Sequence, residues 1–176
     1  ELAKALVSNN MKDSYSIVKH GLFEKHDLEY AKALKELSPQ KAASDLLEYL
    51  SMSPVEELRQ LNLETTNVLV CYEALEHLKN YAINVSNPNF ASLFYYAISR
   101  NHLLASMSQN IINMYTPEHS EYLAIILSKF PAWAQTAYIE RSKRDNSNLK
   151  FLLLSQLKKV SAKKNIRNEA EEALRQ

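Results

Sequence analysis

Residues 87–131 read NPNFASLFYYAISRNHLLASMSQNIINMYTPEHSEYLAIILSKFP, and this stretch decides the fold. Asn87-Pro88 and Thr116-Pro117 each place a residue that favours helix N-caps before a proline, which lacks the backbone N–H that a first helical turn leaves unbonded. Pro131 interrupts an apolar segment, so one helix should end near Phe130 and another should begin at Pro131. The stretch therefore predicts consecutive helices over 88–99, 101–115 and 117–130.

Similar signals extend the helical pattern to both sides. Ser38-Pro39 and Ser53-Pro54 predict two further helix starts. Gly21 follows a basic turn and suits the position just after a helix end. The longest expected helix carries apolar residues at alternating steps of three and four and covers 63–85. The others are expected over 1–8, 12–20, 26–37, 39–51, 54–61, 131–143, 147–160 and 162–175.

The composition agrees with a helical chain. Only one of the 176 residues is glycine, and glycine is needed both in hairpin-rich β folds and in phosphate-binding loops, so both classes are excluded. Apolar residues make up 46% and charged residues 23%, a balance typical of a chain that buries a core. We therefore predict an all-α fold without a β-sheet. It should form a single domain over 1–176, with N-terminal helices over 1–85 and C-terminal hairpins over 88–176.

Two internal echoes are open to two interpretations: a repeat of helical hairpins, or chance similarity between helix-rich segments. The tetrapeptide AKAL at residues 3–6 recurs at 31–34, and residues 93–100 align with 122–129 at an offset of 29. Stacked hairpins bury the apolar faces that one hairpin leaves exposed, so an α-solenoid-like stack of antiparallel hairpins or an irregular multi-helix bundle is expected. The helices over 117–130 and 147–160 are apolar around more than half of their circumference, and we expect both to be covered on several sides.

Residues with catalytic or metal-binding potential are sparse. One cysteine and five scattered histidines form no CxxC, HExxH or Glu-x-x-His pattern, so no metal site is expected. Cys71 and His77 lie six residues apart on one expected helix and point in different directions, and we interpret Cys71 as a core thiol. A GxSxG nucleophile motif is impossible with one glycine. We expect no enzymatic activity, no catalytic residue and no cofactor.

Charge is unevenly distributed although the net charge is only +1. Residues 1–140 carry 11 Lys and Arg against 16 Asp and Glu, whereas residues 141–167 carry nine basic residues and one acidic residue. Such a segment can attract an acidic protein or a phosphate backbone. The expected basic patch consists of Arg141, Lys143, Arg144, Lys158, Lys159, Lys163, Lys164 and Arg167.

Tyrosine and tryptophan residues gather in the C-terminal hairpins. Both are enriched at binding hot spots because they bury a large area and keep a polar group. Tyr96 lies on the far side of its helix from Phe94, so we expect it to be an exposed anchor. Trp133 is expected to pack between stacked hairpins. The candidate partner-binding residues are Tyr95, Tyr96, Trp133 and Tyr138.

These features favour a non-catalytic adaptor or scaffold domain that binds a partner helix or peptide on a helical-hairpin surface. The partner is expected to be another protein, either acidic or presenting an amphipathic helix. Two alternatives stay open: a nucleic-acid-binding helical-repeat module that uses residues 141–167, and a small helical enzyme or its regulatory domain.

The setting of the protein is also predicted from its sequence. No apolar run reaches the length that spans a bilayer, so no transmembrane segment is expected. The single cysteine favours a reducing, intracellular and cytoplasmic location. The chain is interpreted as part of a larger protein, and a targeting signal in flanking sequence stays open.

Overall fold

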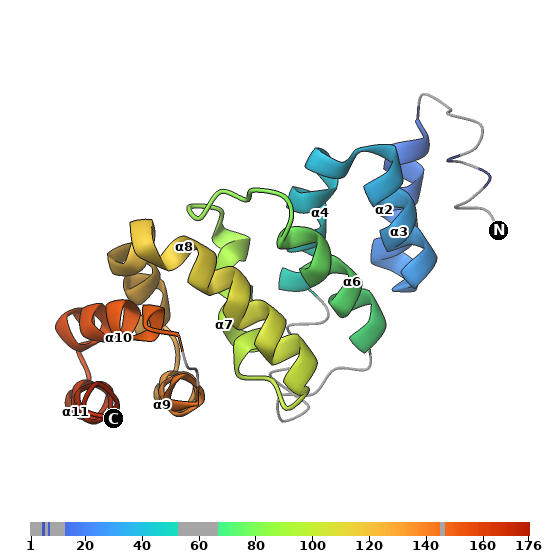
Figure 1. Ribbon diagram of the computed structural model, residues 1–176. Coiled ribbons are helices and arrows are strands. Elements are labelled where there is room, and N and C mark those ends of the chain that lie inside the picture. The colour runs from blue at the N-terminus through green and yellow to red at the C-terminus, as the bar shows by residue number, and fades with distance from the viewer. Residues whose placement is uncertain (1–4, 6, 8–12, 53–66, 145–146) are drawn as a thin grey trace. The chain divides into compact units, whose positions relative to one another are not determined.

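The computed structural model describes residues 5, 7, 13–52, 67–144 and 147–176. The chain divides into two compact units, Glu1–Ser92 and Leu93–Gln176. All regular elements in the described ranges are helices, which confirms the predicted all-α class (Figure 1). The single domain expected over 1–176 stays a prediction, because two compact units can belong to one domain. Most of the helix expected over 1–8, and all of the helix expected over 54–61 with its start at Ser53-Pro54, lie outside the described residues.

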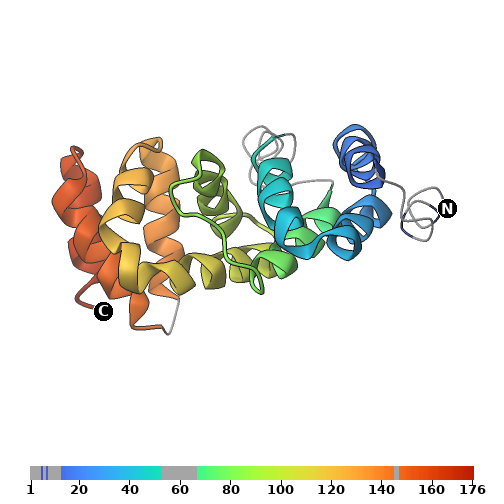
Figure 2. The same cartoon turned by 90° about the horizontal axis from the view of Figure 1, so that it is seen from above.

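In its described residues the first unit contains α2 (Ser14–Lys25), α3 (Leu28–Leu37), α4 (Pro39–Ser51), α6 (Val68–Leu78) and the 3₁₀ helix η1 (Pro88–Ala91). α3 packs against α2, α4 and α6, and α4 also packs against α6 and η1 (Figure 2). These helices bury leucines completely, among them Leu22, Leu34, Leu46 and Leu75. Each fully buried leucine contributes about 1.5–3 kcal/mol to folding. One apolar core therefore holds this unit together.

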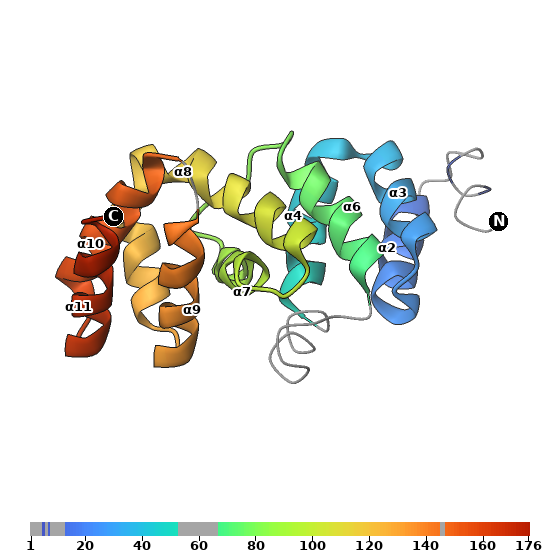
Figure 3. The same ribbon diagram turned by 60° about the horizontal axis from the view of Figure 1, so that its bottom comes forward.

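The second unit begins within α7 (Ser92–Ala97) and continues through α8 (His102–Ser128), α9 (Ala132–Lys143), α10 (Leu149–Val160) and α11 (Lys164–Ala173). α10 packs along α8 and α11, and α11 also packs on α9 (Figure 3). α7 is the enclosed element of the unit, because every side chain from residue 92 to residue 99 is buried.

Three of the proline signals mark helix starts as predicted. α4 begins at Pro39, η1 begins at Pro88, and α9 begins directly after Pro131. The Asn87 side chain also accepts a hydrogen bond from the Asn89 backbone N–H, at 2.9 Å, and so satisfies a donor that the first turn leaves open. Helix starts with a local chemical cause can therefore be predicted from this sequence.

The helix end predicted at Gly21 is wrong. α2 continues through Gly21 to Lys25 and ends at His26, which has a φ of 51° and takes the left-handed conformation expected of Gly21. Gly21 serves close packing instead, because a Cβ atom at this position would overlap the ring of Tyr30. The glycine allows α2 and α3 to approach each other.

Two further helix boundaries differ from the prediction. The helices expected over 101–115 and 117–130 are joined in α8, which passes through Pro117 with a kink at His119, where φ is −127° and ψ is 17°. A kink lets a helix accommodate the missing N–H of a proline. The helix expected over 63–85 ends earlier, with α6 at Leu78, where the Asn80 side-chain amide donates to the Glu76 carbonyl oxygen at 3.1 Å and satisfies an acceptor that the last turn leaves open.

α9 and α11 run side by side in the same direction. The Lys163 ammonium group donates a hydrogen bond to the Phe130 carbonyl oxygen, 3.0 Å away, just before both helices begin. Farther along, the Thr136 hydroxyl donates to the Glu169 carboxylate at 2.7 Å. Both bonds join residues 33 positions apart, so the two helices start at the same end of the unit.

Buried positions recur every 30 residues in this unit. Three corresponding sets, each at most 2% exposed, are Leu93, Phe94 and Ala97; Leu123, Ala124 and Leu127; and Leu153, Leu154 and Leu157. The same offset of 30 relates buried residues of α8 to buried residues of α9: Leu104, Ala105, Ser108, Gln109 and Ile112 match Ala134, Gln135, Tyr138, Ile139 and Ser142. The sequence similarity between residues 93–100 and 122–129 has an offset of 29, whereas the pattern of buried positions repeats with an offset of 30.

The second half of α8 and the whole of α10 are less covered than expected. Tyr122 and Ile125 on α8 and Leu152 on α10 are exposed. The expectation that both helices are covered on several sides is therefore wrong for these residues. Each helix turns one side to solvent, and this side carries apolar side chains that the periodicity alone assigned to the interior.

Candidate interaction surface

Aromatic side chains from α7, α9 and the loop before α9 gather into one cluster. The Phe94 ring meets the rings of Tyr138 and Phe130 edge-on, with centroids 5.2 and 5.8 Å apart. The Tyr95 ring is stacked on Phe130 at 4.7 Å and lies 6.4 Å from the indole of Trp133. Stacked and edge-to-face arrangements are favourable for ring quadrupoles. The aromatic cluster therefore holds its members in defined orientations.

Trp133 is the exposed member of the aromatic cluster. This residue is 49% exposed, whereas Tyr95 and Phe130 beside it are 6% and 9% exposed. It lies in the first turn of α9, whose start is fixed by Pro131. The expectation that Trp133 packs between stacked hairpins is therefore wrong. The indole presents a large apolar surface to solvent above a rigid support.

The three candidate tyrosines lie inside the unit. Tyr96 is 0% exposed, and Tyr138 and Tyr95 are also buried. The predicted exposure of Tyr96 is wrong, because α7 is enclosed and the side of this helix opposite Phe94 also faces protein. The Tyr138 hydroxyl accepts a hydrogen bond from the Gln109 side-chain amide at 2.9 Å. Tyr95 and Tyr138 therefore belong to the core of the second unit, and Tyr96 is an interior residue as well.

The structure divides the predicted basic patch between the two ends of the α9–α11 pair. Because α9 and α11 run parallel, their first residues lie at one end and their last residues at the other. α10 is joined to α11 by a short loop, so the last turn of α10 lies at the end where α11 begins. One group is Arg141, Lys143 and Arg144, and the other is Lys158, Lys159, Lys163, Lys164 and Arg167.

Several of these basic side chains bind groups of the protein itself. Lys143 donates to Glu140 at 2.6 Å, and this hydrogen bond raises the pKa of Lys143. Lys158 forms an ion pair with Glu171 at 3.3 Å. Arg167 donates to the carbonyl oxygens of residues 161 and 162, at 2.9 and 3.1 Å, just past the last residue of α10. A cation at a helix C-terminus is stabilising, so part of the basic segment serves the fold.

Three lysines around the starts of α9 and α11 are exposed and form no ion pair with the described residues: Lys129, Lys159 and Lys164. Residues 128–136 and 158–168 together contain six Lys and Arg residues and no Asp or Glu. We call these two stretches, which include Trp133, the cationic end. Sequence reasoning missed Lys129 because it lies outside 141–167. The structure brings the loop of Lys129 to the basic segment through the hydrogen bond from Lys163 to the Phe130 carbonyl oxygen.

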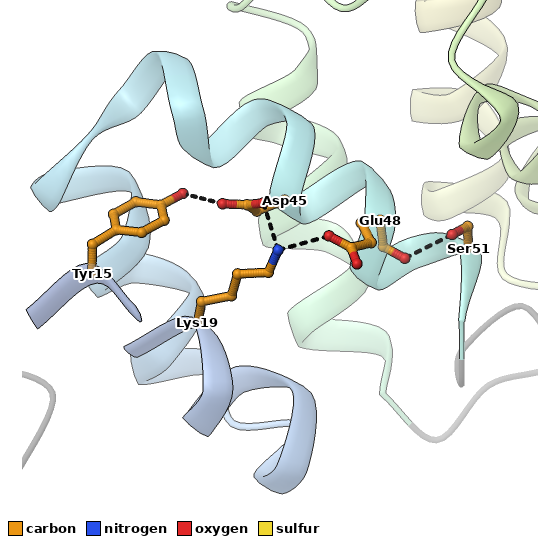
Figure 4. A network of polar contacts seen from close by, with 5 residues as sticks. All are labelled: Tyr15, Lys19, Asp45, Glu48 and Ser51. Carbon is orange, nitrogen blue, oxygen red and sulfur yellow. Dashed lines mark hydrogen bonds and ion pairs between the residues drawn. The ribbon is translucent and has the colours of Figure 1, made fainter. Parts of the chain in front are cut away.

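A separate polar network joins α2 and α4 in the first unit (Figure 4). The Tyr15 hydroxyl donates to Asp45 at 2.5 Å, and the Lys19 ammonium donates to Asp45 at 2.8 Å and to Glu48 at 2.7 Å. Burial, together with the Asp45 carboxylate, raises the pKa of Tyr15. Burial opposes the charge on Lys19, but its two hydrogen bonds outweigh that effect and raise its pKa. Tyr15 and Lys19 therefore stay protonated at neutral pH, which suits a structural tie rather than acid–base catalysis.

Cys71 and His77, whose side chains could support nucleophilic or acid–base chemistry, both lie on α6. Cys71 is completely buried, as predicted for a core thiol. His77 is buried on the same helix, and the Lys35–Glu73 ion pair joins α3 to α6 near it. Among the described residues no group of three or more His, Cys, Asp or Glu is placed to hold a metal ion.

None of the described helices combines the length and apolar character that crossing a bilayer requires. Comparison of the chain with protein-family models, with curated proteins and with solved structures found no match.

Proposed function

We propose that the chain is a non-catalytic protein–protein interaction module, an adaptor or scaffold, whose contact surface is centred on Trp133. The observation that carries the proposal is the half-exposed indole beside Tyr95, whose ring is stacked on Phe130. Tryptophan dominates many interfaces because one residue buries a large area with only two rotatable bonds. A partner that covers this indole would remove apolar surface from water.

The rigid support strengthens the proposal. The Tyr95 ring is fixed by stacking on Phe130, which is itself fixed by Phe94. Immobilising a flexible side chain on binding opposes association by about 0.5–1.5 kcal/mol. The rings beside the indole are already held in place, so this part of the surface is preorganised for a partner.

The recurrence of buried positions every 30 residues also supports this function. It is expected of helical hairpins that stack in an array, which we propose for the second unit. Such arrays offer an extended surface to peptides and partner helices and need no catalytic residues for that role.

A pull-down from a lysate of the native host tests the proposal. The bait is the wild-type chain, with nuclease added to remove nucleic acid and mass spectrometry to identify what is retained. We expect one or a few proteins to be retained by the wild type and lost with Trp133→Ala. Leu152→Ala is the matched control, because it also truncates an exposed apolar side chain of the same unit.

Either of two results contradicts the proposal. Retention that disappears on nuclease treatment assigns the surface to nucleic acid. Retention that is equal for the wild type and Trp133→Ala removes Trp133 from the contact.

A further inference from the structure

We propose that the cationic end binds an acidic peptide segment of another protein, which lays an apolar side chain against Trp133 and its carboxylates against Lys129, Lys159 and Lys164. This inference names the chemistry of the partner and rests on the proposed function. It follows from the placement of an exposed indole at the same end of the unit as three exposed lysines that form no ion pair with the described residues.

The basic segment is linked to the indole through Phe130 and Tyr95. Lys163 donates to the carbonyl oxygen of Phe130, and the ring of Phe130 is stacked on Tyr95 beside Trp133. Lys129 directly precedes Phe130, and Lys164 directly follows Lys163. Trp133 in the first turn of α9, Lys159 in the last turn of α10 and Lys164 at the start of α11 therefore lie at the same end of the unit.

Most of the charge at this end is not paired with carboxylates: among the described residues Lys158 pairs with Glu171, and the Thr136 hydroxyl binds Glu169. Six Lys and Arg residues stand in the two stretches without an acidic residue, and neither α9 nor α11 has an acidic residue in its first turn. Lys158, Lys163 and Arg167 have partners within the protein. The other three lysines are exposed and available to carboxylates. A partner with negative charge complements this surface and is steered toward it.

The observations favour a peptide over a single-stranded nucleic acid. Single-strand binding uses several aromatic rings on which successive bases stack, together with a basic groove that follows the backbone. Here only the Trp133 ring of the aromatic cluster is exposed, and Arg141 and Arg144 lie at the opposite end of α9 from the cationic end. One apolar anchor with three nearby lysines matches a short acidic segment.

The test uses a defined peptide and the intrinsic fluorescence of Trp133, the only tryptophan of the chain. The probe is a synthetic peptide with a Leu-Phe pair flanked on both sides by glutamates, and its matched control has glutamine in place of every glutamate. We expect the acidic peptide to change the Trp133 emission saturably and the glutamine peptide to bind at least about tenfold more weakly. The affinity for the acidic peptide should also fall when salt screens the charges.

Charge-reversal variants locate the contact. The combined change Lys129→Glu, Lys159→Glu and Lys164→Glu should weaken binding of the acidic peptide by at least about tenfold, as like charges replace complementary ones. Arg144→Glu is the matched control: it reverses an exposed cation at the opposite end of α9 and should leave the affinity unchanged. Trp133→Ala should weaken binding in a calorimetric titration, which needs no fluorescence.

Three results overturn the inference: no saturable binding of the acidic peptide, equal binding of the glutamine peptide, or an unchanged affinity in the triple variant. Tighter binding of a single-stranded oligouridine than of the peptide also overturns it and assigns the cationic end to nucleic acid. The lysate experiment separates this failure from failure of the proposed function. A protein that is lost with Trp133→Ala but retained by the triple variant supports the interaction module and refutes the acidic partner.

Discussion

The Nε2 atom of His77 lies 2.7 Å from the carbonyl oxygen of Pro39, and this contact ties the last turn of α6 to the first residue of α4. A carbonyl oxygen only accepts hydrogen bonds, so Nε2 carries the proton. The imidazole is also stacked on the ring of Tyr81, with centroids 4.3 Å apart. His77 is thereby held in one orientation by a polar and an aromatic neighbour.

The stability of the protein should depend on pH through His77. Burial lowers the pKa of His77 below its ordinary value of about 6.5, and the nearby Lys35 ammonium acts in the same direction. As pH falls through about 6.5, the unfolded chain takes up a proton that the folded chain does not, so the free energy of unfolding decreases by at most about 1.4 kcal/mol per pH unit. Urea unfolding followed by circular dichroism between pH 7.5 and 5 would measure this slope.

The matched variants for this prediction are His77→Gln and His20→Gln. Glutamine keeps a donor for the Pro39 carbonyl oxygen but does not titrate, so His77→Gln should flatten the slope. His20 is exposed on α2, and His20→Gln controls for the loss of one imidazole from the same unit. An equal slope in the wild type and in His77→Gln would contradict this assignment.

Lys163 should contribute to the stability of the second unit through its bond to Phe130. Lys163→Met keeps the aliphatic stem and removes the donor, which should lower the free energy of unfolding by about 1–2 kcal/mol, because a hydrogen bond from a charged donor is lost. Lys164→Met is the control, since the Lys164 side chain is exposed and its ammonium group forms no hydrogen bond or ion pair with the described residues. Its effect should stay within about 0.5 kcal/mol. Equal losses in the two variants would show that the bond to Phe130 has no special weight.

Tyr96 and Trp133 should respond in opposite ways to truncation. Tyr96 is completely buried, so Tyr96→Ala leaves a cavity and should lower the free energy of unfolding by about 3–5 kcal/mol. Trp133 is half-exposed, and Trp133→Ala should cost less than about 2 kcal/mol. Thermal unfolding of the two variants measures the difference. A larger loss in Trp133→Ala would mean that this indole belongs to the core.

Asp45 should be the residue on which the network between α2 and α4 depends. Asp45→Ala deprives both Tyr15 and Lys19 of an acceptor and should lower the free energy of unfolding by about 2–3 kcal/mol. Tyr15→Phe removes one donor while Asp45 keeps its hydrogen bond from Lys19, so this change should lower the free energy of unfolding by about 1 kcal/mol. A double-mutant cycle should give a coupling energy above about 0.5 kcal/mol between Tyr15 and Asp45. Strict additivity of the two changes would contradict the hydrogen bond.

Features with a local cause were predictable from this sequence. Pro39, Pro88 and Pro131 restrict their own backbone and lack a donor, so each marks the same boundary in the chain and in the structure. Pro117 was misinterpreted because a proline after threonine looks the same at a helix start and at a kink. What distinguishes the two is whether the chain continues in the same direction, and tertiary packing decides this.

Which side chains are buried and which are exposed was less predictable from the sequence. Gly21 resembles a helix terminator, but its role depends on the ring of Tyr30, nine residues away on another helix. The exposure of Tyr96 was predicted from its position around the helix axis, and the burial of Trp133 from the expected stacking of hairpins. Neither argument contains information about what covers each side of a helix. Of the four candidate aromatic residues, only Trp133 is therefore exposed. The parallel course of α9 and α11 divides the basic segment between two ends of the unit.

The burial of Cys71 and the exposure of Trp133 give each unit a natural reporter. Cys71 is the only thiol of the chain and belongs to the first unit, whereas the only indole belongs to the second. A thiol reagent reacts with Cys71 only when the first unit opens, because the side chain is inaccessible in the folded state. The opening of one unit can thus be timed chemically while the other is observed optically, without adding a label or changing a residue.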